Sequence, residues 1–237
     1  LKMDSTRNTM EVIDLMLKRR SIRSYRDIPV PKDVLVDLMI AAQYAPHAGN
    51  AHTCRVIVVD EEEKKDALAD ASCHQSWMKS APVHIVIVSD VERIEKMYGE
   101  RGKKIYSHQN AAAMAENIII QATAHELATC WVGAFNADMI SQVLDVPGEY
   151  EPQVIITVGY AAEEVPTPVK QNLRGLVYLN GWVHYNNVPF TRKDYSQVLQ
   201  NHLKRASKQL KNTGDHIGKK LKRHFDKTVD EWKNKKK

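Results

Sequence analysis

The sequence predicts an α+β protein with three layers, in which helices cover both faces of a central sheet. Three short β-branched runs, at 55–59, 83–88 and 153–160, are typical of buried strands. Between them the apolar residues recur at helical spacing, most clearly over 107–127. A chain in which helices and strands alternate packs most simply as α-β-α, and 237 residues that are 43% hydrophobic can bury one substantial core.

The first part of the chain predicts two helices and a loop before any strand. A first amphipathic helix ends at Arg19, and a second helix begins at Pro31, where proline suits the first turn, and ends at Pro46. Residues 45–52 then form a loop of small residues in which the backbone can approach a ligand closely. An ordinary turn would have the same composition.

The remaining elements follow in order up to Tyr160. The charged segment 92–104 has the composition of a lid or of a surface excursion. The other expected elements are a helix at 62–71, a strand at 83–88, a helix at 107–127, a strand at 129–135, a helix capped by Asn136 and a strand at 153–160.

The positive charge of the chain is concentrated in its C-terminal tail. The net charge is +5, but residues 196–237 hold 13 Lys or Arg against four Asp or Glu, so the rest of the chain is mildly acidic. Two amphipathic stripes, 199–210 and 217–232, run through this tail. We therefore expect a main domain at 1–190 and a basic helical extension at 191–237. The extension either packs over a neighbouring subunit or contacts an anionic surface, and its lysines lack the aromatic pattern of specific nucleic-acid binding.

The motifs exclude several common classes of site. No Gly-x-Gly-x-x-Gly follows a strand, residues 214–220 lack the spacing of a phosphate-binding P-loop, and no Gly-x-Ser-x-Gly hydrolase elbow occurs. The histidines and the three cysteines match no metal-binding pattern, so no metal is expected. Because the chain has no apolar run of about 18 residues, we expect a soluble, cytoplasmic protein.

One basic cluster predicts an anion site. Arg19, Arg20, Ser21 and Arg23 place three guanidinium groups and a hydroxyl within five residues, directly after a helix. Guanidinium groups present planar donor pairs that match the oxygens of a phosphate, and serine adds a further donor. The alternative is a solvated basic helix end, which the helix dipole favours.

Four motifs, taken in order, carry a family resemblance. They are the arginine-serine cluster at 19–23, the loop Ala45–Asn50, the segment Tyr106–Ala112 and the segment Cys130–Phe135. In this order and at these separations, the chain resembles the FMN-dependent nitroreductase family over residues 9–182. The resemblance implies the fold of that family, with a mixed central sheet, in an intertwined homodimer that holds FMN at the subunit interface.

The resemblance also implies which residues bind FMN. The cluster at 19–23 would hold the phosphate, the loop would come from the other subunit, the segment after Cys130 would lie against the isoalloxazine, and a late basic residue would complete the phosphate site. The implied cofactor-binding residues are Arg19, Arg20, Ser21, Arg23, Pro46, His47, Ala48, Asn50, Trp131, Val132, Gly133, Ala134 and Arg174, with Lys170 as the alternative to Arg174.

One departure from the family pattern affects this site. Family members commonly continue the loop with Gln-Pro-Trp, where this chain has His52, Thr53 and Cys54. Whether His52 donates a hydrogen bond to the flavin is therefore open, with a structural loop histidine as the alternative.

The implied function is that of an oxidoreductase, with the chemistry carried by the flavin and no catalytic side chain expected. It would transfer hydride from NADH or NADPH to a small organic acceptor, such as a nitroaromatic compound or a quinone, by a ping-pong scheme. No motif encodes the natural acceptor or the preferred nucleotide. Two alternatives stay open: a flavoprotein reductase fed by a protein electron donor, and a non-catalytic FMN-binding protein tethered by its basic tail.

Overall fold

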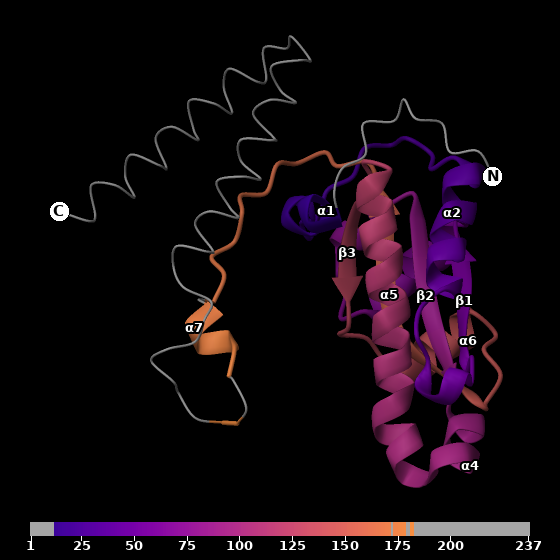
Figure 1. Ribbon diagram of the computed structural model, residues 1–237. Coiled ribbons are helices and arrows are strands. Elements are labelled where there is room, and N and C mark those ends of the chain that lie inside the picture. The colour runs from indigo at the N-terminus through magenta and orange to yellow at the C-terminus, as the bar shows by residue number, and fades with distance from the viewer. Residues whose placement is uncertain (1–11, 172, 179–180, 183–237) are drawn as a thin grey trace. The chain divides into compact units, whose positions relative to one another are not determined.

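The computed structural model describes residues 12–171, 173–178 and 181–182 (Figure 1). The chain divides into two compact units, Leu1–Thr167 and Pro168–Lys237. The described part of the second unit includes the short helix α7 (Leu173–Leu176). The predicted domain boundary at 190 and the helices predicted in the basic tail lie outside the described residues.

A four-stranded sheet with the order β1-β2-β4-β3 forms the centre of the first unit (Figure 1). The three strand pairs are antiparallel, and the parallel element of the expected mixed sheet is a single bridge between Ser21 and Thr129. The four predicted strands are confirmed, with ends that differ by a few residues. They are β1 (Cys54–Val59), β2 (Val83–Asp90), β3 (Ala128–Val132) and β4 (Tyr150–Gly159).

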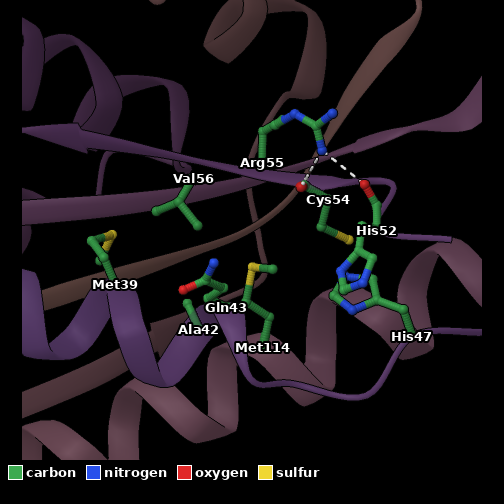
Figure 2. Close-up of a pocket in the computed structure, with 9 residues that line it drawn as sticks. All are labelled: Met39, Ala42, Gln43, His47, His52, Cys54, Arg55, Val56 and Met114. Atoms are coloured by element: carbon green, nitrogen blue, oxygen red, sulfur yellow. Dashed lines mark hydrogen bonds between the residues drawn. The ribbon is translucent and has the colours of Figure 1, made fainter. Parts of the chain in front are cut away.

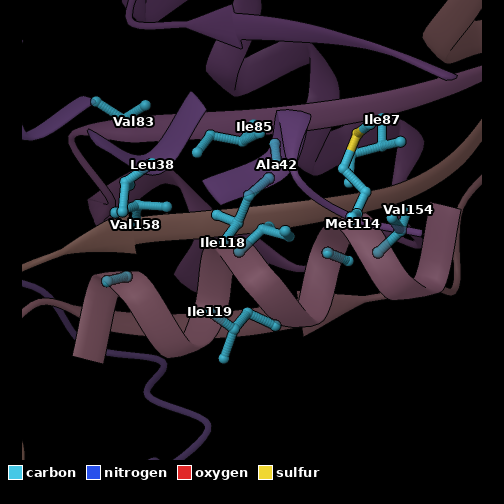
Figure 3. Close-up of a cluster of buried hydrophobic side chains, with 14 of the residues drawn as sticks. Leu38, Ala42, Val83, Ile85, Ile87, Met114, Ile118, Ile119, Val154 and Val158 are labelled. Carbon is cyan, nitrogen blue, oxygen red and sulfur yellow. The ribbon is translucent and has the colours of Figure 1, made fainter. Parts of the chain in front are cut away.

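Helices cover both faces of the sheet, which confirms the three predicted layers. The covering helices are α2 (Lys32–Gln43) and α5 (Ser107–Ala124) on one face, and α3 (Glu62–Ala71) and α6 (Ala137–Val143) on the other. Buried aliphatic side chains fill the space between α2, α5 and the sheet (Figure 3). β2 is buried on both faces because Ile85 and Ile87 enter this cluster, whereas Val86 and Val88 enter the second one, under α3 and α6.

The segment at 92–104, expected to be a lid or a surface excursion, is helical. α4 (Val91–Arg101) follows β2 directly, and the Asp90 carboxylate caps it by accepting a hydrogen bond from the Arg93 amide at 2.8 Å. A π-turn, η3 (Gly102–Tyr106), joins α4 to α5. The charged residues form ion pairs on the helix surface, namely Lys96–Glu92, Lys103–Glu95 and Lys104–Glu100.

A short helix, α1 (Val12–Lys18), and the 3₁₀ turns η1 (Ala48–Asn50) and η2 (Ser76–Ser80) complete the described elements of the first unit. α1 buries Leu15, whereas its other large apolar side chains are 40–60% exposed; these are Val12, Ile13, Met16 and Leu17. Within the described part of the chain, no helix has both the length and the apolar character needed to cross a membrane.

Candidate functional site

The arginine-serine cluster lies beside the edge strand β3. α1 ends at Lys18, and the chain then runs alongside β3, where Ser21 forms a parallel bridge with Thr129. The Ile22 amide donates a hydrogen bond to the Thr129 carbonyl at 3.0 Å. Backbone pairing therefore brings the first and fourth motifs of the sequence together.

Arg20 is engaged with the end of its own helix. Its Nη1 donates hydrogen bonds to the carbonyls of Leu17 and Arg19, both at 2.7 Å, and its Nη2 donates to the hydroxyl of Thr167. Desolvation by partial burial, together with the neighbouring charge of Arg19, lowers the pKa of Arg20 below its ordinary value. These bonds satisfy carbonyl groups that every helix leaves open at its C-terminus.

Arg19 and Arg23 act electrostatically on Cys130 of β3. Burial raises the pKa of the Cys130 thiol, and the positive charges of Arg23 and Arg19 act in the opposite direction. The Arg23 amide donates a hydrogen bond to a carboxylate oxygen of Glu163 at 2.6 Å, and its guanidinium lies 5.7 Å from the centre of the Trp77 ring. Neither arginine forms an ion pair with the described side chains.

The end of β3 is exposed and carries small residues after Trp131. The Trp131 side chain is 42% exposed, whereas Val132 is buried among the side chains under α6, so only its backbone can face a ligand. Gly133 and Ala134 are exposed and carry no bulky side chain. The Gln75 amide reaches the Ala134 carbonyl at 3.4 Å and ties this end of β3 to the rest of the unit.

The loop at 45–52 has an unusual backbone. Gly49, Asn50 and His52 all have positive φ angles, of 53°, 55° and 48°. A Cβ on Gly49 would have a positive φ and would collide with the hydroxyl of Tyr98 from α4, so a side chain there would require Tyr98 to shift. The Ala48 amide donates a hydrogen bond to Oδ1 of Asn110 on α5 at 2.9 Å. The second and third motifs of the sequence are thus in contact.

Two histidines of this loop border a cavity of about 250 Å³ (Figure 2). The rings of His47 and His52 lie 5.2 Å apart, and Nδ1 of His47 lies 3.0 Å from the Ala45 carbonyl, which makes it the donor there. Nε2 of His47 is buried without a hydrogen-bond partner among the described residues. The cavity is lined by Met39, Ala42, Gln43, His47, His52, Cys54, Arg55, Val56 and Met114.

Sequence reasoning missed this cavity because its walls come from α2, the loop, β1 and α5, which are far apart in the chain. Burial raises the pKa of the Cys54 thiol to about 11, so this cysteine stays protonated at neutral pH and is a poor nucleophile or metal ligand. Arg55 turns away from the cavity, since its guanidinium donates to the carbonyls of His52 and Cys54, both at 2.8 Å (Figure 2).

The arginine-serine cluster and the loop 45–52 lie at opposite corners of the sheet. The loop 45–52 leads into the edge strand β1 at the level of Ser89, near the end of β2. Ser21 pairs with the other edge strand, β3, at the level of Val83, where β2 begins. The corners are separated by three strand spacings, about 14 Å, across the sheet and by roughly 20 Å along it.

The last two predicted residues belong to the second unit. Lys170 lies in an exposed stretch, and Arg174 lies within α7. A contact of Lys170 or Arg174 with a phosphate held by the first unit stays a prediction.

The fold and the site define an α+β protein with a cluster of arginines beside an open strand end. The model of the nitroreductase family matches residues 16–74 and 69–160, more than half of the chain. The chain belongs to the nitroreductase family.

Relatives with names or structures support the same fold. A protein of Thermus thermophilus named "NADH dehydrogenase" is 25% identical over 189 residues, which cover 68% of this chain and 92% of that protein. The solved structure of an FMN-dependent nitroreductase from Clostridium difficile is similar at a TM-score of 0.60 and 29% identity, and the match covers 74% of this chain and 99% of that one. The structure of Bacillus megaterium NfrA2 matches at a TM-score of 0.68 and 22% identity, covering 74% and 76% of the two chains.

Proposed function

We propose that the protein is an FMN-dependent oxidoreductase that takes hydride from NADH or NADPH and delivers it to a small organic acceptor, such as a nitroaromatic compound or a quinone. Family membership supports this proposal, as do the names of relatives, among them "NADH dehydrogenase" and "FMN-dependent Nitroreductase". A relative from Bacillus subtilis named "FMN reductase [NAD(P)H]" is 36% identical over 83 residues, which cover 35% of this chain and 33% of that protein.

The residues beside β3 fit a flavin mononucleotide. Two guanidinium groups without an ion-pair partner among the described residues, a serine hydroxyl and exposed backbone make a donor set suited to a phosphate dianion. Arg19, Ser21 and Arg23 would hold the phosphate, with Lys170 or Arg174 as a further cation. Trp131, Gly133, Ala134 and the Val132 backbone would border the ring.

Arg20 has a different role in this proposal, because its guanidinium already caps α1. It supports the cluster by holding the helix end in place. When bound, FMN supplies the hydride chemistry; the chain supplies its binding and orientation, together with the exclusion of water.

A second copy of the chain completes the site. The single observation that carries this step is that the arginine cluster and the loop lie at opposite corners of the sheet, which keeps the loop of one chain far from its own arginine cluster. In a homodimer the loop of the partner, with Pro46, His47, Ala48 and Asn50, would approach the flavin held by the first chain. The exposed apolar side chains of α1 give such a dimer a surface to bury.

In a ping-pong scheme, the nucleotide and the acceptor would bind one after the other at the open end of β3. The open strand end at Trp131–Ala134 offers one flat surface, and the chain needs no acid-base pair when the flavin carries the electrons. In this proposal, the shape of the binding region at Trp131–Ala134, rather than a catalytic side chain, selects the natural acceptor.

The direct test of the proposal is a visible absorption spectrum of the purified protein, followed by anaerobic addition of NADH or NADPH. A flavin spectrum that bleaches on addition, and returns when an acceptor such as menadione is added, is the expected result. A protein that binds no added FMN, or a flavin that neither nucleotide reduces, would contradict it.

A further inference from the structure

The side chain of Asn110 ties the inside of the loop at 45–52 to the residue that follows the loop. Asn110 lies near the start of α5 and is 4% exposed. Its Oδ1 accepts the hydrogen bond from the Ala48 amide at 2.9 Å, and its Nδ2 lies 3.4 Å from the hydroxyl of Thr53, which is fully buried. One buried amide therefore links Ala48, inside the loop, to Thr53, directly after it.

The loop needs such a support, because its own backbone bonds are few. Within it, the Asn50 amide bonds to the His47 carbonyl at 2.9 Å and the Ala51 amide to the Ala48 carbonyl at 3.1 Å. Positive φ angles at Asn50 and His52 are unfavourable for residues with side chains and persist only where the surroundings hold them. Asn110 makes the bond that reaches Ala48 from outside the loop.

The fold aims Asn110 at the loop from a rigid base. The π-turn η3 closes with the Ser107 amide bonded to the Gly102 carbonyl, and α5 starts from it. A π-turn adds a residue to a helical turn and so rotates the helix that follows, which is a common device at functional sites. On the other side, Tyr98 of α4 packs against Gly49. The loop is held between α4 and α5.

We propose that Asn110 is a positioning residue for cofactor binding: it holds the loop at 46–52 in the shape in which the loop reaches the FMN of the partner subunit. This inference rests on the proposed function. Asn110 itself is buried behind the loop and acts through the Ala48 amide.

The alternative is that Asn110 merely stabilises the fold, and the chain contains a matched control for it. Asn117 lies on the same helix, seven residues later, and its Nδ2 donates a hydrogen bond to the Ala41 carbonyl at 3.0 Å. That bond ties α5 to α2 and does not touch the loop. Asn117→Ala therefore removes a comparable bond with no effect on the loop.

The experiment is a titration of flavin-free protein with FMN, followed by flavin fluorescence, together with thermal unfolding of the same samples. The variants are Asn110→Ala, Asn110→Asp and Asn117→Ala. Asn110→Ala should raise the Kd for FMN about tenfold, as expected for one lost hydrogen bond to a binding element. Asn110→Asp should stay within about threefold of the wild type, because its carboxylate still accepts from Ala48 and the Thr53 hydroxyl can donate to it.

A second route removes the same bond without changing α5. Ala48→Pro deletes the amide donor, and the extended backbone of His47, with φ −126° and ψ 147°, suits a residue that precedes proline. This variant should also raise the Kd about tenfold, so the test holds even if Asn110→Ala fails to fold.

The outcomes separate the two proposals. If Asn117→Ala lowers the unfolding temperature as much as Asn110→Ala and leaves the FMN Kd within about twofold, the positioning role of Asn110 is supported. Equal FMN affinity in the wild type, Asn110→Ala and Ala48→Pro would overturn this role and leave the proposed function standing. A wild-type protein that takes up no FMN would overturn both.

Discussion

The two corners of the sheet that carry the candidate site are built in different ways. At the β3 corner, Ser21 and Ile22 pair with Thr129 through the backbone, and the proposed phosphate contacts lie in half-buried and exposed arginines next to that pairing. At the β1 corner, the loop has three positive φ angles within four residues and is held by side chains from α4 and α5. The first corner therefore tolerates loss of its side chains, whereas the second loses its shape when a supporting contact is removed.

The largest effect on binding is expected at the first corner. Replacing both Arg19 and Arg23 with alanine should weaken FMN binding about 100-fold or more, since each charge-assisted hydrogen bond contributes about 1.5–3 kcal/mol. The unfolding temperature of the flavin-free protein should change little, because Arg23 is exposed and Arg19 is only half-buried. FMN titration and thermal unfolding measure the two quantities. Arg26→Ala, a charge loss at an exposed residue three positions later, is the control and should bind FMN normally.

Protonation of a buried histidine in the sheet should lower the stability of the whole fold, and therefore of both corners alike. His84 of β2 is fully buried, its Nε2 lies 3.0 Å from the Met78 carbonyl, and burial lowers its pKa from 6.5 to about 4. The unfolded chain then takes up a proton at a higher pH than the folded one. Stability should be complete above about pH 6.5 and should fall by about 3 kcal/mol as the pH drops to 4.

Urea unfolding at pH 7.5, 5.5 and 4 measures this dependence on pH. Because carboxylates titrate in part of the same range, the comparison is with His84→Leu, in which the contribution of the imidazole is absent. The free energy of unfolding should depend less on pH in the variant than in the wild type. Equal slopes in the two proteins would contradict the assignment to His84.

At the second corner, Gly49→Ala should cost stability as well as FMN affinity. The new Cβ would have a positive φ and would collide with the Tyr98 hydroxyl, which together should destabilise the fold by about 2 kcal/mol. Urea unfolding measures the loss. Gly148→Ala is the matched control, because a Cβ at Gly148 meets nothing within 4 Å. Similar losses in both variants would remove the special role of Gly49.

The smallest effect is expected at Arg20. If its guanidinium caps α1, Arg20→Gln should reduce the free energy of unfolding by about 0.5–1 kcal/mol and leave the FMN Kd within about twofold. Arg23→Gln should show the opposite pattern, with weaker FMN binding and unchanged stability. A large loss of FMN affinity in Arg20→Gln would place this arginine on the phosphate after all.

The sequence was sufficient for the layers, the strands and one helix cap, because these depend on local patterns. Asn136, for example, caps α6 as predicted, with its Oδ1 accepting from the Met139 amide at 3.0 Å. The helix α4 was not predicted, because its sequence is mostly charged with few apolar positions and its ion pairs form only once the helix exists.

The site was predictable only in part. The motifs at 19–23 and 45–50 carried a chemical signal, but their positions at opposite corners depend on the strand order, which no local pattern encodes. The support from Asn110 and Tyr98 and the walls of the cavity depend on contacts between residues far apart in the chain. The motif did not reveal that the Val132 side chain is buried. Successive residues on a strand point to opposite faces, so the neighbour of the exposed Trp131 points into the core.

The central claim is that one FMN site takes its arginine cluster from one chain and its loop from the other. Subunit mixing tests this most directly. Arg19→Ala/Arg23→Ala chains and Gly49→Ala chains, each defective at one corner, are co-expressed with different tags, and the bound FMN of the mixture is measured. If the site is shared, each mixed dimer has one intact site, and random pairing restores about a quarter of the wild-type FMN binding. If the mixture binds no more FMN than the two variants alone, each site lies within a single chain and the account is wrong.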